Sequence, residues 1–227
     1  MGDQSYTPAL GHAALTPLYD VAISLLTRER TWRSALASAL NLLPEERVLD
    51  VGCGTGTFAI QLKCAVPDAW VIGLDPDPRV LEQAQRKANE QNADVEWRQG
   101  FLSDELVTDL WPLTSVVSSL VFHQTPIPEK QRILGAMWEA LEPGGRLVIA
   151  DYGEQRTRTM RFLFRRTVQT LDGVEDTTPN AEGCLPIYMR EAGFVDVEEQ
   201  AVINTLTGSI SIYQARKPND GGVYARH

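Results

Sequence analysis

The sequence predicts an α/β protein with a doubly wound, mostly parallel sheet of seven strands, an antiparallel C-terminal edge and an N-terminal helical lid. Short apolar runs alternate with helical patterns from Glu46 to about Asp151, and this alternation favours parallel strands joined by crossover helices. Two β-patterned runs near the C-terminus would add the antiparallel edge. With 227 residues, 43% of them hydrophobic, the chain can bury the core that such a fold needs.

The predicted elements follow one another along the chain. Apolar residues recur at helical spacing in Tyr19–Leu26 and Trp32–Leu43, and Pro44 closes this region. Buried strands are predicted at Val48–Val51, Trp70–Leu74, Val95–Arg98, Val116–Leu120 and Arg146–Ala150. The helices between them are predicted at Phe58–Val66, Pro78–Asn92 and Glu129–Leu141, and Glu142–Gly145 should turn from the last helix into the next strand.

The last third of the chain has a different pattern. An Arg-rich helical stretch, Arg156–Leu171, is followed by a polar stretch, Asp172–Asn180, which predicts a loop. A helix near Leu185–Ala192, with Gly193 as its C-cap, precedes the β-patterned runs Val195–Val202 and Thr205–Ala215. We expect an N-terminal helical lid (1–44), one α/β domain (45–217) with a lid insertion (154–180), and a loose tail (218–227).

Composition and charge disfavour several functions. The net charge of −9 opposes a broad nucleic-acid footprint, which needs a positive face. The N-terminal segment lacks a secretory signal pattern and no apolar run is long enough to cross a bilayer, so we expect a cytoplasmic protein. Cys53, Cys64 and Cys184 lack metal-ligand spacing, so we expect neither a metal nor disulfides. The oligomeric state, monomer or homodimer, stays open.

A glycine-rich turn directly follows the first predicted strand. Val48–Val51 runs into Gly52, Cys53, Gly54, Thr55 and Gly56 before a helix begins. Glycines at alternate positions allow a sharp turn and let a ligand lie against exposed main chain. One residue separates Gly54 from Gly56, whereas the dinucleotide fingerprint needs two. This spacing disfavours a nicotinamide oxidoreductase.

An acidic residue stands at the end of the second predicted strand. Asp75 lies 19 positions after Gly56, where a carboxylate can accept hydrogen bonds from both ribose hydroxyls of an adenosine ligand. The glycine turn and Asp75 together predict an adenosine-binding site. The alternative is a structural turn beside an unrelated exposed aspartate.

Three segments, Val48–Gly56, Gly73–Pro78 and Leu141–Gly153, resemble the class I S-adenosylmethionine-dependent methyltransferases. The chain most resembles the bacterial group that includes the ubiquinone/menaquinone C-methyltransferases, from about Leu18 to Lys217. Leu18–Arg33 is similar to the Tyr-Asp and Trp-Arg elements that those enzymes place over the cofactor. The resemblance implies a Rossmann-like fold, S-adenosylmethionine as cofactor and S-adenosylhomocysteine as product.

The resemblance also implies roles for individual residues. Asp50 would brace the glycine turn, Asp75 would hold the ribose, and Pro76 would lie beside the adenine. The backbone of Ser118 and Ser119 would meet the methionine end. The residues implied to pack against the methionine portion and the ribose are Gly52, Cys53, Gly54 and Gly56.

One segment departs from the family pattern. After the third strand, Gly100 is followed by Phe101, where relatives often have an acidic residue that binds the adenine amine. We expect the adenine to be read by the Leu102 backbone and by packing on Phe101. The alternative is that Phe101 is an ordinary core aromatic.

Two residues are candidates for the chemistry. The resemblance implies that His123 lies near the transferred methyl group, and its near-neutral pKa would suit a base that deprotonates a phenol or amine. A histidine that only packs a loop is the alternative. Tyr19 is the second candidate, and a helix tyrosine that faces the core is its alternative.

These features predict methyl transfer to a small-molecule acceptor such as a quinol, phenol, amine or lipid-like compound. The reaction is an in-line displacement, in which orientation and exclusion of water are the main contributions of the enzyme. The alternative function is a non-catalytic, S-adenosylmethionine-binding regulatory protein. The Arg156–Arg166 segment is consistent with contact to substrate, with peripheral contact to an anionic membrane, or with a solvated helix face.

Overall fold

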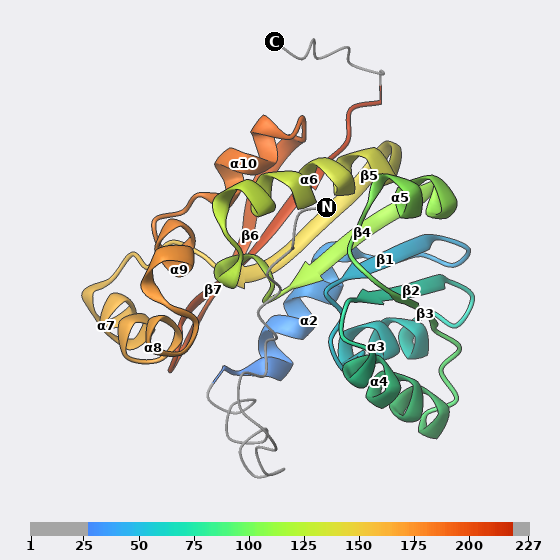
Figure 1. Cartoon of the computed structure of the whole chain (residues 1–227), viewed down its shortest axis with the longest axis horizontal. Coiled ribbons are helices and arrows are strands. Elements are labelled where there is room, and N and C mark those ends of the chain that lie inside the picture. Colours follow the sequence, from blue (N-terminus) through green and yellow to red (C-terminus); the bar gives the residue numbers. More distant parts are fainter. Residues whose placement is uncertain (1–26, 220–227) are drawn as a thin grey trace, which may run out of the picture.

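A seven-stranded sheet organises residues 27–219, which are the residues that the computed structural model describes (Figure 1). The strands are β1 (Arg47–Val51), β2 (Trp70–Asp75), β3 (Glu96–Gln99), β4 (Leu113–Ser119), β5 (Leu141–Tyr152), β6 (Val195–Thr205) and β7 (Gly208–Arg216). Their spatial order is β3-β2-β1-β4-β5-β7-β6. The first five strands pair in parallel, whereas β7 is antiparallel to both β5 and β6. The predicted parallel sheet with an antiparallel C-terminal edge is confirmed.

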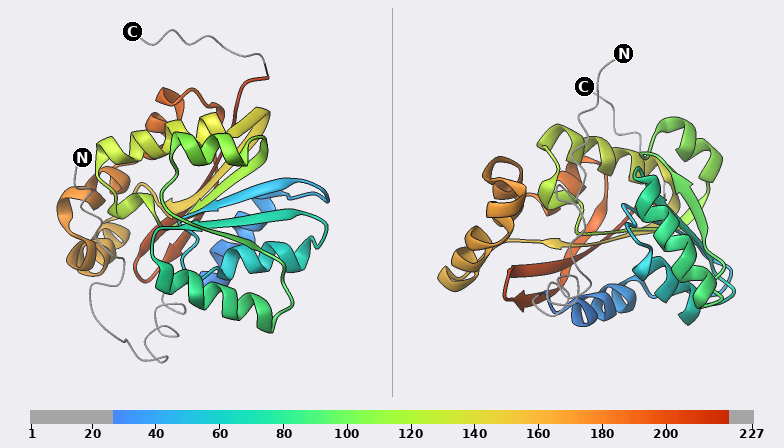
Figure 2. Two further views of the ribbon diagram at one scale, coloured as in Figure 1. Left: turned by 45° about the vertical axis from the view of Figure 1, so that its right-hand side comes forward. Right: turned by 60° about the horizontal axis from the view of Figure 1, so that its bottom comes forward.

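Helices cover both faces of this sheet, as Figure 2 shows. One face carries α5 (Asp104–Leu110), α6 (Ile127–Ala140) and α10 (Leu185–Glu191), and the other carries α2 (Glu29–Leu40), α3 (Thr57–Ala65) and α4 (Pro78–Glu90). Neighbouring residues of β1 point into different hydrophobic clusters, Leu49 into one and Val48 into the other. Because both faces are covered, the strands read in the sequence as continuous apolar runs.

The first described helix, α2, packs against the sheet. Its Trp32, Leu36 and Leu40 are buried together with residues of β1 and β5. The described part of the predicted N-terminal lid therefore lies among the helices that cover the sheet. Residues 1–26, which include the predicted helix Tyr19–Leu26, lie outside the described residues, as do residues 220–227.

Between β5 and α10 the chain forms three short helices, α7 (Arg158–Arg166), α8 (Val168–Asp172) and α9 (Val174–Ala181), which we call the lid. The prediction of one continuous helix is wrong at Thr167, because its backbone (φ −116°, ψ −82°) is not helical. The prediction of a loop from Asp172 to Asn180 is also wrong. Thr177 and Thr178 donate their hydroxyls to carbonyl oxygens four residues earlier, so these polar side chains are satisfied within α9.

Two further differences concern element boundaries. The patterns described above do not predict α5, although Ser103 caps it by accepting a hydrogen bond from the Leu106 N–H at 3.3 Å. The helix expected to end at Leu141 ends at Ala140, and Glu142–Gly145 form the irregular start of β5 instead of a separate turn. Neither difference moves the carboxyl ends of the strands.

Candidate active site

The predicted site residues meet at one edge of the sheet. Val51 pairs with Leu74 on one side and with Ser118 on the other, and Ser119 pairs with Ala150. The carboxyl ends of β1, β2, β4 and β5 are therefore adjacent, and the segments that leave them lie side by side. In open parallel sheets, ligands bind outside this edge.

The glycine turn leaves β1 with a left-handed backbone at each glycine. The φ angles of Gly52, Gly54 and Gly56 are 73°, 53° and 72°. A Cβ on Gly52 would overlap the Val121 side chain, and one on Gly56 would overlap Trp97. A Cβ on Gly54 would meet no atom of residues 27–219 within 4 Å. Packing within the protein thus accounts for two of the three glycines in the turn, whereas the main chain at Gly54 is open as far as residues 27–219 are concerned.

The indole of Trp97 on β3 forms a support beneath the turn. Besides lying against Gly56, it lies where a Cβ of Gly73 on β2 would be. Cys53 is half-buried in the same turn, and its Sγ lies 3.8 Å from the Gly54 carbonyl oxygen. Burial raises the pKa of the Cys53 thiol far above its usual range. The thiol therefore stays protonated and acts as a packing group.

Asp75 connects the end of β2 to the glycine turn. Its Oδ2 accepts a hydrogen bond from the Gly54 N–H at 2.9 Å, and its Oδ1 accepts one from the Asp77 N–H at 3.0 Å. Burial raises the pKa of Asp75, whereas these two N–H groups lower it. Each carboxylate oxygen retains a lone pair for a further donor, so the carboxylate can also accept from ribose hydroxyls. Pro76 is half-buried beside it.

Asp50, two residues before the turn, is a buried carboxylate whose oxygens accept no hydrogen bond from residues 27–219. Burial raises its pKa to about 7; the charge of Arg33 on α2 opposes the rise, and the charge of Asp75 adds to it. The structure contains no hydrogen bond by which Asp50 would brace the turn. An unpartnered buried carboxylate is costly, and a positively charged ligand group nearby would relieve that cost.

A groove of about 910 Å³ lies beyond the end of β3 and is lined by Gln99, the residue that pairs with Asp75 of β2. Gly100, Phe101 and Leu102 line it, and Phe101 exposes 40% of its surface. Phe101 is therefore not a core aromatic. Leu102 is buried, and its carbonyl oxygen accepts a hydrogen bond from Arg132 at 2.8 Å. Phe101 thus adds exposed apolar surface to this groove.

The end of β4 is fixed to β1 before the chain turns out of the sheet. The buried Ser118 donates its hydroxyl to the Val51 carbonyl oxygen at 2.8 Å. Ser119 is half-buried, and the next residue, Leu120, has a positive φ of 56°. This backbone turn directs the following short 3-10 helix, η1 (Phe122–Gln124), toward the end of β5.

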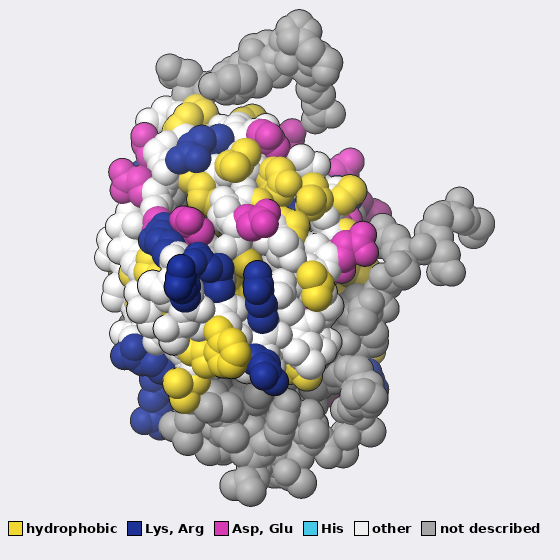
Figure 3. Space-filling view, turned by 90° about the vertical axis from the view of Figure 1, so that its left-hand side faces the viewer, with side chains coloured by type: hydrophobic (Ala, Val, Ile, Leu, Met, Phe, Trp, Pro, Cys, Tyr) yellow, Lys and Arg dark blue, Asp and Glu magenta, His cyan; other side chains and the backbone are white. Residues whose placement is uncertain are grey.

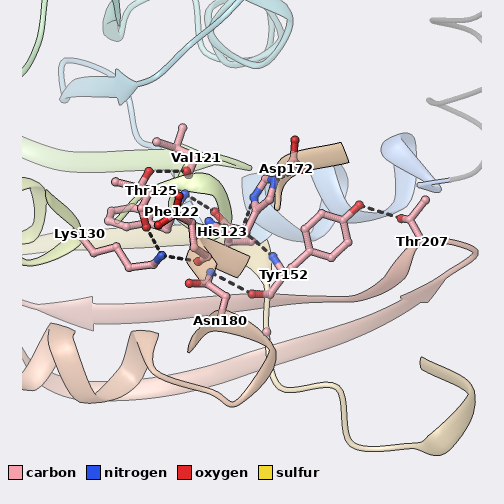
Figure 4. A network of polar contacts seen from close by, with 12 residues as sticks. Val121, Phe122, His123, Thr125, Lys130, Tyr152, Asp172, Asn180 and Thr207 are labelled. Carbon is pink, nitrogen blue, oxygen red and sulfur yellow. Dashed lines mark hydrogen bonds and ion pairs between the residues drawn. The ribbon is translucent and has the colours of Figure 1, made fainter. Parts of the chain in front are cut away.

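His123 on η1 is buried between two carboxylates (Figure 4). Its Nδ1 lies 2.8 Å from Asp151 Oδ1 at the end of β5, and its Nε2 lies 3.5 Å from Asp172 Oδ2 on the lid. Asp151 also accepts hydrogen bonds from the N–H groups of Phe122 and Tyr152, both at 2.7 Å. Burial lowers the pKa of His123, but the two carboxylates outweigh burial and raise it to about 9. His123 is therefore an imidazolium at neutral pH.

Several contacts fasten the lid to this cluster. The Tyr152 ring packs edge-on against His123, with centroids 5.0 Å apart. Asn180 of α9 donates to the Tyr152 carbonyl oxygen at 3.1 Å. The buried Lys130 of α6 donates to the carbonyl oxygens of Thr125, just after η1, and of Asp176 on α9, the latter at 3.0 Å. The lid is thus held over η1 by hydrogen bonds to main-chain carbonyl groups (Figure 4).

The structure brings most of the predicted residues together and adds three. Asp75, Gly54, the Ser118–Ser119 pair and His123 belong to one edge, whereas Tyr19 lies outside the described residues. The sequence patterns give no role in the site to Asp151 or Lys130, and predict for Asp172 only that it partly offsets the charge of the preceding arginines. Asp151 lies within the Leu141–Gly153 segment, so the resemblance of that segment to the methyltransferases is the sequence feature that could have identified Asp151 as a site residue. Asp172 begins the polar stretch that predicts a loop, and no sequence pattern distinguishes Lys130 from other lysines.

Comparison with known proteins identifies the class that this fold and site define. A family model described as a methyltransferase domain matches residues 48–145. Demethylmenaquinone methyltransferase of Thermus thermophilus is 31% identical over 167 residues, which cover 70% of this chain and 74% of that protein. The protein of the same name from Deinococcus radiodurans is 30% identical over 155 residues, covering 67% of this chain and 63% of that protein. The chain thus spans less than two thirds of the Deinococcus relative.

Solved structures agree on the fold. An O-methyltransferase family protein from Burkholderia thailandensis superposes with a TM-score of 0.67 at 15% identity, covering 88% of this chain and 59% of that chain. A phosphoethanolamine N-methyltransferase of Haemonchus contortus, solved with S-adenosylhomocysteine, superposes with a TM-score of 0.64 at 17% identity, covering 83% of this chain and 52% of that chain. The fold and the similarity to these proteins place the chain among the class I S-adenosylmethionine-dependent methyltransferases. The chain belongs to the methyltransferase family that includes the bacterial menaquinone and ubiquinone C-methyltransferases.

Proposed function

We propose that the chain transfers the methyl group of S-adenosylmethionine to a small, partly apolar acceptor, such as a quinol or another phenol. The observation that carries this proposal is the open main chain at Gly54 beside the Asp75 carboxylate, at the edge where His123 also lies. The names of the relatives, demethylmenaquinone methyltransferases, favour a quinol among the acceptors. The alternative of a non-catalytic regulatory protein finds no support in these relatives, which are named as enzymes.

The residues of this edge fit the cofactor. Asp75 has lone pairs for the ribose hydroxyls, and the unpartnered carboxylate of Asp50 fits the positive amino group of the methionine portion. Phe101 and Pro76 offer apolar surface to the adenine, and Gly54 leaves room for the ligand. When bound, S-adenosylmethionine supplies a methyl group on a positively charged sulfur, which is the electrophile of the reaction.

His123 would act on the acceptor as a charged hydrogen-bond donor. At neutral pH its pKa of about 9 keeps both ring nitrogens protonated. An imidazolium cannot take a proton from an acceptor, but it can donate a hydrogen bond to an acceptor that binds as its phenolate, after the phenol has given its proton to bulk solvent. Asp151 lies 2.8 Å from Nδ1, whereas Asp172 lies 3.5 Å from Nε2. The acceptor would therefore replace Asp172 as the partner of the Nε2–H, while Asp151 keeps the Nδ1–H.

The lid would exclude water from this reaction. Its α9 packs over η1, and the hydrogen bonds of Lys130 and Asn180 to main-chain carbonyl groups hold α9 there. Displacement at a sulfonium releases a neutral sulfide, so the enzyme has no leaving anion to stabilise. Holding the nucleophile in line with the methyl–sulfur bond and keeping the site dry are then the main contributions.

A ligand and turnover series tests the proposal. The purified chain is titrated calorimetrically with S-adenosylmethionine, S-adenosylhomocysteine and NAD, and then assayed for S-adenosylhomocysteine release with short-chain quinols, simple phenols and amines. We expect binding of the two sulfur ligands, no binding of NAD, and turnover fastest with a quinol. Binding of NAD alone, or binding of the sulfur ligands without turnover of any acceptor in the panel, would contradict the proposed activity.

A further inference from the structure

The outer surface of α7 is basic in an otherwise acidic protein. Residues 156–171 contain five arginines and no acidic residue, although the net charge of the chain is −9. Four of these arginines, at positions 158, 161, 165 and 166, lie on α7 and are exposed. Figure 3 shows Lys and Arg side chains gathered on the lid side of the molecule, with hydrophobic side chains between and beside them.

No acidic residue within 27–219 forms an ion pair with these four arginines. Among the described residues, the guanidinium groups of Arg158 and Arg165 make no hydrogen bond or ion pair, and that of Arg161 donates only to main-chain carbonyl oxygens. The guanidinium carbon of Arg166 lies 5.5 Å from the centre of the Phe162 ring. The positive charges on this helix are therefore available to an external partner.

An exposed aromatic ring lies among these charges. Phe162 exposes 58% of its surface, whereas Phe164 is buried and packs against Tyr152 with ring centroids 5.3 Å apart. Phe164 already anchors α7 to the protein, so Phe162 contributes little to that anchoring. Leu171 and Val174, which follow in the lid, expose 68% and 63%. On α7 itself Phe162 is the exposed large apolar residue among the arginines, and Leu171 on α8 and Val174 on α9 extend the apolar surface. Exposed apolar side chains beside arginines are typical of helices that lie on a lipid surface.

We infer that α7 docks the protein onto the surface of an anionic lipid bilayer. Phe162 enters the headgroup region, and Arg158, Arg161 and Arg165 pair with lipid phosphates. A nucleic-acid duplex, whose bases are stacked in its interior, would meet the charges but would give no apolar environment to Phe162. None of the helices in residues 27–219 is long and apolar enough to cross a membrane. The inference concerns only the outer surface of the lid, so it stands or falls independently of the proposed methyl acceptor.

Vesicle sedimentation tests this inference. The full chain is mixed with vesicles of equal parts phosphatidylglycerol and phosphatidylcholine, and with vesicles of phosphatidylcholine alone, over a series of salt concentrations. We expect binding to the anionic vesicles only, weakening as salt rises. Arg158→Gln/Arg165→Gln should weaken binding about thirtyfold, since each basic residue at an anionic surface contributes about 1 kcal/mol. Phe162→Ser should also weaken binding, with less change in its salt dependence.

A matched variant separates the surface from net charge. Arg86→Gln/Arg190→Gln removes two exposed arginines on α4 and α10 and should bind the anionic vesicles like the unmodified chain. Circular dichroism and thermal unfolding verify that each variant is folded. Absence of binding at low salt, equal binding to both vesicle types, equal loss in both double variants, or equally tight binding to a DNA duplex would each overturn the inference.

Discussion

Nδ1 of His123 lies 2.8 Å from Oδ1 of Asp151, across the gap between η1 and the end of β5. The same carboxylate accepts N–H groups from both segments, so one buried charge organises the ring, the 3-10 helix and the strand end. The contact decides which chemistry is open to the histidine. Without a partner, burial would make the imidazole neutral; with Asp151 and Asp172 beside it, the ring is charged.

We predict that this pairing makes stability depend on pH. The pKa of His123 is about 9 in the folded protein against 6.5 for a free side chain. Its stabilising contribution is therefore complete below about pH 6.5 and is lost as pH rises through about 9. Urea unfolding across this range should show the free energy of unfolding of the wild type falling toward that of His123→Gln. Parallel curves for the two proteins would contradict the assigned charge.

Replacing Asp75 should affect the cofactor more than the fold. Asp75→Ala removes the acceptor for ribose hydroxyls and leaves the Gly54 N–H without its partner, so S-adenosylmethionine should bind more weakly by about 1–3 kcal/mol. The control is Asp94→Ala, which removes an exposed aspartate before β3. Calorimetric titration measures both. An unchanged affinity in Asp75→Ala would remove Asp75 from the site.

The glycines of the turn should divide into two classes. Gly54→Val points into open space, so the protein should fold, at a cost of about 1–2 kcal/mol for the left-handed backbone, but should no longer bind S-adenosylmethionine. Gly56→Val would overlap Trp97 and should lose clearly more stability than Gly54→Val. Thermal unfolding and ligand titration distinguish the two losses. Retained binding of S-adenosylmethionine by Gly54→Val would contradict the proposal that the ligand lies against the main chain at Gly54.

Lys130→Met should loosen the lid without unfolding the sheet. The substitution keeps the volume of the buried side chain and removes its hydrogen bonds to the Thr125 and Asp176 carbonyl oxygens. Hydrogen bonds to charged groups contribute about 1.5–3 kcal/mol, so amide exchange in α9 should accelerate roughly tenfold or more. Exchange in β1 and β4 is the internal control, and equal acceleration there would assign Lys130 to global stability instead.

Cofactor affinity should depend on the ionisation of Asp50. Burial raises its pKa to about 7, and an adjacent amino group would favour the charged form. Affinity for S-adenosylmethionine should therefore rise with pH and level off above about 7. Asp50→Asn should abolish this rise while the dependence caused by other groups remains. Identical pH profiles for the two proteins would place the amino group away from Asp50.

The sheet and the cofactor edge could be predicted because their signals are local. Val48–Val51 is buried on both faces and reads as a strand, and Gly54 and Asp75 mark the ends of neighbouring strands. The sequence does not show which side chain makes a glycine necessary at each position, because Val121 and Trp97 contact Gly52 and Gly56 only in the folded chain.

The polar network around His123 could not be predicted for the same reason. Asp172 follows a stretch that was expected to be one helix, and only the break at Thr167 brings it toward the imidazole. The helix α9 was hidden because Thr177 and Asn180 are polar yet buried, so its sequence lacks the apolar periodicity on which such predictions depend. The charge state of His123 follows from these tertiary contacts and not from its own neighbours in sequence.

The position of the Trp97 indole has a consequence for how this chain can vary. Gly73 has an ordinary backbone conformation, and a methyl group there would overlap the indole and lie 3.1 Å from the Cys53 Sγ. An alanine at position 73 is therefore compatible with this fold only if position 97 has first been substituted by a smaller ring or an aliphatic side chain. Such a paired exchange would also remove the indole that packs against Gly56. A conservative change in the interior of β2 and β3 would then alter the shape of the glycine turn, and with it the cofactor site.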